Sequence, residues 1–180
     1  MRQTMGMRIG DAVQHWWDRQ PWAGKSRSEV ERATTARVAD LIGMSGTAMS
    51  GALEAVDLCR RLDLPIAVCS GSDITVIDAG LRRLGIEATV SVRHSAEWDQ
   101  WGKPHPGPYL STADKLGVDP TRCLALEDSF HGAISAKSAR MRVVVVPDPA
   151  ALESPRWGFC DAVLPSLARF DEALLRTLEA

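Results

Sequence analysis

Residues suited to phosphate chemistry follow an apolar run in the second half of the chain. Residues 123–126 are apolar, and the adjacent carboxylates Glu127 and Asp128 come directly after them. A short apolar run followed by a helix-like segment is typical of a central strand in a parallel sheet. Two neighbouring carboxylates repel each other unless a cation lies between them, and their hard oxygens suit Mg²⁺. The pattern predicts half of a phosphoryl-transfer site, although the same acids could serve only to stabilise a helix dipole.

Two further segments add groups that bind phosphate. Ser70 and Gly71 follow the apolar run 65–69, which predicts a second strand, and Lys103 lies in the run 102–106 that opens a helical segment. Ligands bind beyond the carboxyl ends of the strands in such sheets. Taken singly, Lys103 also fits a surface ion pair and Ser70 a strand-ending turn. The joint pattern favours a phosphate site.

These segments resemble a known family. Ser70, the Gly-Lys-Pro-His-Pro run at 102–106, and the Leu-Glu-Asp-Ser run at 126–129 followed by Gly132 are similar to the second, third and fourth motifs of the haloacid dehalogenase superfamily. The variant resembles the helical-cap branch, subfamily I, which contains β-phosphoglucomutase. Arg8-Ile9 and the runs 19–22 and 115–120 look most like its 2-deoxyglucose-6-phosphate phosphatases (hexitol phosphatases).

The resemblance implies a fold and a set of residue roles. The fold is α/β, with a Rossmann-like parallel sheet flanked by helices and a small α-helical cap. Ser70, Gly71 and Lys103 would bind phosphate, with Ser70 and Lys103 also acting in catalysis, while Glu127 and Asp128 would hold Mg²⁺. Arg8 would contact the substrate from the cap, although an arginine at a helix start fits simple solvation equally well. The reaction would be hydrolysis of a small sugar phosphate of the hexose 6-phosphate class through an aspartyl-phosphate.

One motif of the family has no counterpart in the 180 residues. This motif is a hydrophobic strand ending in Asp-x-Asp-Gly, and it lies ahead of the cap in family members; its first Asp is the nucleophile and its second the acid/base. We therefore expect an N-terminally truncated member that lacks its first sheet strand and is inactive alone. The alternatives are a noncatalytic remnant that binds phosphate or a partner protein, and a β-phosphoglucomutase-like mutase. A complete protein is expected to be a monomer, whereas the truncated chain would expose two interior strand edges and could self-associate.

Composition and charge exclude several other classes of protein. The chain is 45% hydrophobic and 24% charged, which indicates a folded protein. Its net charge of −2 does not indicate the positively charged surface that a nucleic-acid-binding protein needs. No apolar run is long enough for a signal peptide or a membrane span, so a cytoplasmic protein without a membrane partner is expected. The four cysteines and four histidines show no metal-ligand spacing, which predicts reduced thiols and no histidine metal site.

Other phosphate and hydrolase motifs fail at single positions. Gly46 and Gly51 have the spacing of the two glycines in a Walker loop. The residue after the second glycine must be lysine in that motif, but here it is Ala52. No Gly-x-Gly-x-x-Gly follows a strand. Ser70 lacks the glycine two positions earlier that a hydrolase elbow needs, because Val68 occupies it.

Residues 43–50 have the composition of a linker. With the resemblance, this implies a partial helical cap at 1–47 and an α/β core at 48–180 that lacks its first strand. The cap is predicted to hold helix 8–19 and a second helix that starts with the capping box of Ser26 and Glu29 and carries one apolar face. Its tryptophans are expected to pack between the two helices rather than stack on sugar. The expected core elements are helix 51–62, strand 65–69, helix 73–84, strand 88–92, polar loop 94–101, helix 108–116, strand 124–126, helix 130–140, strand 142–146, edge strand 161–164 and helix 170–178.

Overall fold

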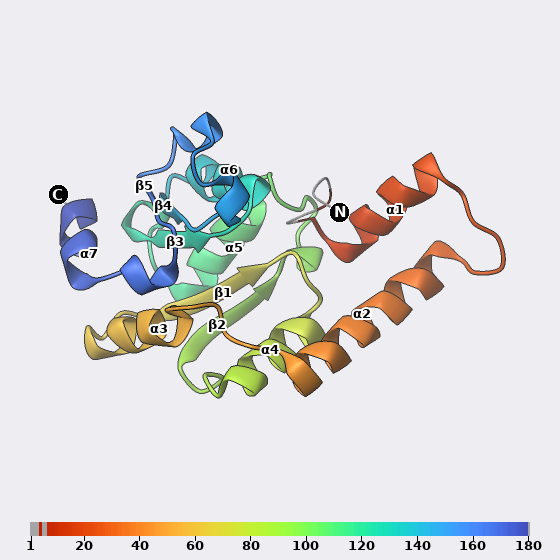
Figure 1. Cartoon of the computed structure of the whole chain (residues 1–180), viewed down its shortest axis with the longest axis horizontal. Helices are drawn as coiled ribbons and strands as arrows, with labels where there is room; N and C mark the ends of the chain where they lie inside the picture. Colours follow the sequence, from red (N-terminus) through yellow and green to blue (C-terminus); the bar gives the residue numbers. More distant parts are fainter. Residues whose placement is uncertain (1–3, 5–6, 180) are drawn as a thin grey trace.

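The structure of the chain is a computed structural model that describes residues 4 and 7–179. It is an α/β protein in which parallel strands are flanked by helices, as the sequence predicts (Figure 1). The helices and strands are α1 (Ile9–Arg19), α2 (Arg27–Ser45), α3 (Ala52–Arg61), β1 (Ile66–Ser70), α4 (Ile74–Leu84), β2 (Val90–Ser95), α5 (Gly107–Leu116), β3 (Leu124–Glu127), α6 (Phe130–Ser138), β4 (Arg142–Val145), β5 (Ala162–Val163) and α7 (Glu172–Glu179).

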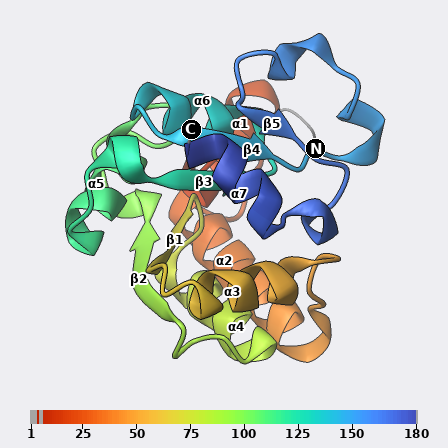
Figure 2. The same cartoon turned by 90° about the vertical axis from the view of Figure 1, so that its left-hand side faces the viewer.

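The strands form two parallel sheets instead of one. β1 pairs with β2, and β3, β4 and β5 pair in that order. Within the described part of the chain, β1 and β3 form no ladder with each other, and Figure 2 shows them as separate ribbons. Leu126 in the middle of β3 is 37% exposed, and no residue of β1 is fully buried. Two strand edges that the expected single sheet would cover are therefore left without a strand partner.

Lys103 joins β1 and β3 at their carboxyl ends, and a second contact fixes the start of β3. Near their carboxyl ends, the Lys103 ammonium contacts the carbonyl of Cys69 and the carboxylate of Glu127. Near the start of β3, Leu124 packs against the cluster that contains Ala55 and Leu58 of α3. The two strands are thus linked through Lys103, although their backbones form no ladder with each other among the described residues.

The main core lies around β3 and β4. Val143 and Val145 are fully buried, and they cluster with small residues of α5 and α6 and with Trp157. Burying each such side chain contributes about 1.5–3 kcal/mol. Small side chains on the helices allow this close approach to the sheet, which fixes the position of the carboxyl end of β3.

The second strand lies further along the chain than the sequence predicts. β2 spans Val90–Ser95 rather than 88–92, so His94 and Ser95 belong to the strand and not to the following loop. Both are buried, at 2% and 1% exposure. The prediction was wrong because polar residues were assigned to a loop, whereas here they are buried with hydrogen-bond partners.

The first two helices, α1 and α2, agree with the prediction in their bounds and differ in their packing. Ser26 and Glu29 form the predicted capping box. The apolar face expected on α2 is not buried, since this helix has no buried residue along its length, although it passes beside α4 (Figure 1). Trp17 packs edge-on against Trp22 at a centroid distance of 4.7 Å, within α1 and the turn that follows it rather than across to α2.

A glycine marks the point where the linker meets the core. Gly51 precedes α3 with a left-handed φ of +85°, and a Cβ atom there would lie 2.0 Å from the backbone nitrogen of Ala168. Ser166 donates from its hydroxyl to the Ser50 carbonyl at 3.0 Å beside this contact. The C-terminal part of the chain thus covers the start of α3. No helix among the described residues is both long and apolar enough to cross a membrane.

Candidate active site

Lys103 occupies the space between the carboxyl ends of β1 and β3. Its ammonium donates to the Cys69 carbonyl at 3.0 Å and to Glu127 Oε1 at 2.6 Å. It also lies 3.4 Å from the Tyr109 hydroxyl and 4.6 Å from the centre of that ring. The side chains of Lys103 and Glu127 are each 6% exposed. The predicted phosphate-binding lysine and the first predicted metal ligand therefore form a buried ion pair.

Both carboxylate oxygens of Glu127 accept hydrogen bonds. Oε1 accepts from Lys103 and from the Tyr109 hydroxyl, and Oε2 accepts from the Ser129 hydroxyl at 3.1 Å and its backbone amide at 3.4 Å. Burial, together with the charge of Glu127, raises the pKa of Tyr109 well above its ordinary value. The phenol therefore stays protonated and acts as a donor to the carboxylate.

The approach of Glu127 to α6 requires a glycine. Ser129 caps this helix by accepting from the Gly132 amide at 3.0 Å. A Cβ atom on Gly132 would lie 2.1 Å from Glu127 Oε2, closer than atoms can approach. The glycine that follows the Glu-Asp-Ser run in the sequence thus makes room for the carboxylate beside the helix start, where the helix dipole also favours an anion.

Asp128 carries the charge that the site compensates least. The residue as a whole reaches solvent, but its carboxyl lies among protein atoms, and this partial burial raises its pKa above the usual range. The neighbouring Glu127 charge raises it further, and Lys103 offsets only part of the effect. A cation beside Asp128 would relieve this repulsion.

The two acids fit a divalent cation as part of a larger ligand set. Within residues 4 and 7–179, no cluster of three or more His, Cys, Asp and Glu side chains is placed to hold a metal ion. Mg²⁺ commonly keeps several waters and uses one or two protein carboxylates. Asp128, with Glu127 behind it, therefore suits a partial site whose other ligands are water, substrate or groups outside the described residues.

Ser70 ends β1 beside the Lys103 contact. Its hydroxyl accepts from the Ser72 amide at 3.1 Å, which shapes the turn through Gly71 into α4. The preceding residue, Cys69, is the one whose carbonyl contacts Lys103. The structure thus brings Ser70, Gly71, Lys103, Glu127 and Asp128 to one edge of the fold. Their roles toward a ligand remain predictions.

Arg8 lies apart from this group and contacts protein atoms. Its guanidinium forms an ion pair with Asp11 at 2.7 Å and donates to the Asp99 carbonyl at 3.2 Å. It also covers Gly102, where a Cβ would lie 2.9 Å from Arg8 Nε. The predicted substrate contact of Arg8 stays a prediction; the observed contacts join the start of α1 to the loop that leads to Lys103.

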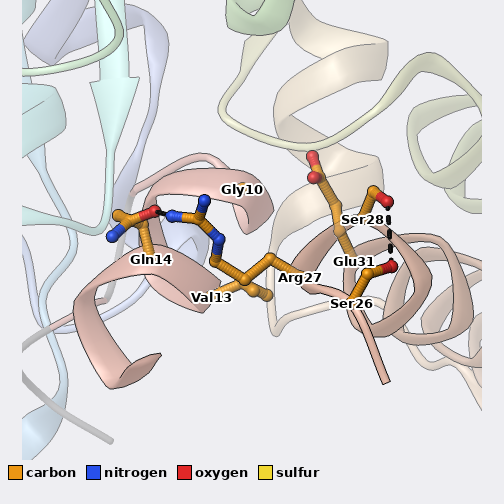
Figure 3. A pocket seen from close by; sticks show the side chains of 7 residues that line it. All are labelled: Gly10, Val13, Gln14, Ser26, Arg27, Ser28 and Glu31. Carbon is orange, nitrogen blue, oxygen red and sulfur yellow. Dashed lines mark hydrogen bonds between the residues drawn. The ribbon is translucent and has the colours of Figure 1, made fainter. Parts of the chain in front are cut away.

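A separate hollow lies between the two cap helices. Figure 3 shows Arg27 reaching toward Gln14 across it, with Ser26 and Ser28 hydrogen-bonded on its other side at 3.2 Å. Its lining residues are Gly10, Val13, Gln14, Ser26, Arg27, Ser28 and Glu31. None of the predicted site residues belongs to this lining.

Sequence reasoning missed Tyr109 and Asp99. Tyr109 lies in the first turn of α5, six positions after Lys103, and a signal for it existed because a polar-tipped aromatic on a buried helix face needs a partner. Asp99 carried no such signal, since a lone aspartate in a polar loop reads as solvated.

Comparisons with known proteins show the family of this chain. A model of the haloacid dehalogenase-like hydrolase family matches residues 2–140. Hexitol phosphatase B of Escherichia coli K12 is 42% identical over 164 residues, which cover 91% of this chain and 74% of the relative.

Two solved structures show a similar fold. CbbY from Rhodobacter sphaeroides in complex with phosphate has a TM-score of 0.83 at 24% identity, covering 91% of this chain and 75% of the other. β-Phosphoglucomutase from Clostridium difficile has a TM-score of 0.84 at 18% identity, covering 98% and 78%.

Proposed function

This chain belongs to the haloacid dehalogenase-like hydrolase family, and we propose that it forms the larger part of a phosphatase for small sugar phosphates of the hexose 6-phosphate class. The observation that carries the proposal is the position of Lys103, whose ammonium joins the ends of β1 and β3 beside Ser70, Glu127 and Asp128. The name of the hexitol phosphatase relative supports the choice of substrate class.

Each residue of the site has a chemical role in this proposal. The Lys103 ammonium attracts the phosphoryl oxygens, and its charge gains value as negative charge builds up in the transition state. The Ser70 hydroxyl donates to a phosphoryl oxygen, and the Gly71 amide beside it is a second donor. Glu127 holds Lys103 in place from behind, and Tyr109 and Ser129 orient that carboxylate through their hydroxyl groups.

Asp128, supported by Glu127, would hold Mg²⁺. When bound, the ion neutralises charge between the phosphate and the carboxylates around it. The position of Asp128 supports this assignment, because partial burial and the neighbouring Glu127 charge raise the pKa of its carboxyl and a bound cation would offset both effects.

The attacking group must come from outside the described site. No Asp-x-Asp sequence occurs in the 180 residues, and none of Ser70, Lys103, Glu127 and Asp128 is a competent nucleophile toward phosphorus in this arrangement. We propose that an extended segment bearing the aspartate nucleophile and acid/base lies between β1 and β3, whose edges toward each other have no strand partner among the residues that the structure describes. The 180-residue chain alone is then inactive and self-associates through these edges.

A noncatalytic phosphate-binding protein is the second candidate. The observation that favours it is Glu127, whose two oxygens are already occupied by four protein donors. Such a protein would use Lys103 and Ser70 to bind phosphate without turnover.

Phosphate release from hexose and hexitol 6-phosphates, measured with Mg²⁺, tests the proposal. The chain alone is expected to give no turnover, whereas the chain with a segment containing Asp-x-Asp-Gly fused ahead of Met1 is expected to turn over. The control fusion carries Asn in place of the first Asp of that segment. In the active fusion, Lys103→Met should lower kcat by roughly 10².

Three outcomes would contradict parts of this proposal. Turnover near 1 s⁻¹, within the ordinary enzyme range, by the chain alone would show that the added aspartates are unnecessary. Phosphate binding without turnover in every fusion would favour the noncatalytic candidate. An unchanged kcat in the Lys103→Met fusion would remove Lys103 from the mechanism.

A further inference from the structure

A buried polar cluster lies beside the loop that carries Lys103. His94, at the end of β2, is 2% exposed, and its Nε2 lies 2.6 Å from Asp99 Oδ2. The other oxygen of Asp99 accepts from the Ser111 hydroxyl of α5 at 2.6 Å. One carboxylate thus joins β2, α5 and the loop between them.

Lys115 determines which nitrogen of His94 carries the hydrogen. Lys115 Nζ lies 2.8 Å from His94 Nδ1 and 4.6 Å from the centre of the Trp98 ring. An ammonium group can only donate, so Nδ1 accepts and Nε2 carries the imidazole hydrogen. Nε2 therefore donates to Asp99, whose carboxylate receives donors on both oxygens. Every polar group of the cluster has a partner in this one arrangement.

The same residue also contacts the cap through its backbone. The Asp99 carbonyl accepts from Arg8, and the Arg8 side chain lies against Gly102, the residue before Lys103. The segment 99–102 is therefore held by its carboxylate on the core side and by Arg8 on the cap side. Only this short segment separates these two anchors from Lys103.

We propose that Asp99 is a positioning residue, which sets the place of the Lys103 ammonium by fixing segment 99–102 against β2 and α5. The inference rests on the proposed function, in which Lys103 binds the phosphoryl group. It goes further because it makes the position of Lys103 relative to the phosphoryl group depend on the Asp99 carboxylate, which does not touch the ligand. Small displacements of a binding group carry a large penalty, about 10² in rate for roughly 1 Å.

The first test measures the affinity of the 180-residue chain for inorganic phosphate. Asp99→Ala should weaken binding roughly tenfold or more, as expected when a charged hydrogen bond loses its geometry. Asp99→Asn should bind like the wild type, because the amide oxygen accepts from His94 and the amide nitrogen donates to the Ser111 hydroxyl. Asp114→Ala, which removes an exposed carboxylate from α5, is the control for charge.

A destabilised variant separates positioning from general stability. Leu58→Ala removes a buried side chain of the α3 cluster and should lower the melting temperature without changing phosphate affinity. An equal loss of affinity in Leu58→Ala and Asp99→Ala at matched stability would overturn the inference. Loss of affinity in Lys103→Met is expected from the proposed function itself, and unchanged affinity there would contradict that function.

The second test needs no ligand. The buried Lys103 ammonium should give a slowly exchanging signal in ¹⁵N spectra of the wild type because Glu127 and Cys69 hold it. The signal should be lost in Asp99→Ala and kept in Asp99→Asn and Asp114→Ala. If Asp99→Ala keeps the wild-type signal, Asp99 does not position Lys103, whether or not phosphate binds.

Discussion

Lys103 Nζ lies 2.6 Å from Glu127 Oε1, and both side chains are almost fully buried. Removing one member of a buried pair leaves an uncompensated charge, which typically costs about 3–5 kcal/mol. Lys103→Met alone should therefore lower the free energy of unfolding by roughly 3 kcal/mol. Lys103→Met combined with Glu127→Gln should recover part of this loss.

Urea unfolding of the four proteins of this double-mutant cycle measures the coupling. Lys25→Met, at an exposed position of the cap turn, is the control for loss of a lysine. Additive effects of the two single changes would show that the pair contributes no interaction energy.

Asp128→Asn tests the second carboxylate without any need for turnover. Mg²⁺ bound to the folded chain raises its melting temperature by mass action. This rise should occur in the wild type and disappear in Asp128→Asn, because a neutral amide no longer needs charge compensation. Asp114→Asn should keep the wild-type response. A Mg²⁺-dependent rise of equal size in Asp128→Asn would remove this residue from the ligand set.

Gly132→Ala tests the contact between β3 and α6. The added methyl group would meet the Glu127 carboxylate at 2.1 Å, so either the helix or the ion pair must move. We expect a loss of about 1–3 kcal/mol in the free energy of unfolding, the usual range for overpacking. Gly80→Ala, where a Cβ meets no atom within 4 Å, is the matched control in α4. Equal stability of the two variants would show that Glu127 moves aside freely.

Amide hydrogen exchange tests the two strand edges. Within residues 4 and 7–179, no strand pairs with the facing sides of β1 and β3. Unpaired backbone groups there cost roughly 1–3 kcal/mol each when buried without water. Exchange followed at Ala67 and Ala125 should therefore be faster than at Val144, whose strand is paired on both sides. If the chain self-associates through these strand edges, a higher protein concentration should slow the exchange of both amides. Strong, concentration-independent protection of both amides in a stable monomer would show that the core is complete as it stands.

Structural features that depend on residues close together in the sequence were predicted well. The capping box of Ser26 and Glu29 involves positions three apart, and the apolar runs before Ser70 and Glu127 mark strands whose carboxyl ends meet at one edge. The order of helices and strands therefore followed from the sequence, and so did the grouping of most of the site.

Contacts between distant segments could not be predicted in the same way. The partner of Asp99 is His94, which was assigned to the polar loop 94–101, and its burial depends on how β2 packs against α5. The burial of α2 was overestimated because one apolar face was assigned to it, whereas its apolar residues are spread around the helix and none of its residues is buried. The ion pair of Lys103 and Glu127 was also not predicted, because Lys103 was assigned to phosphate and Glu127 to Mg²⁺.

Gly51 restricts how this protein can change over evolutionary time. Its left-handed backbone and the approach of Ala168 leave no room for any side chain, whereas the exposed neighbours Met49 and Ser50 can vary freely. Every missense mutation at codon 51 must therefore disturb the C-terminal segment as well as α3. An exchange of the segment ahead of α3 for that of another protein would therefore keep the contact with Ala168 only if Gly51 is kept as well.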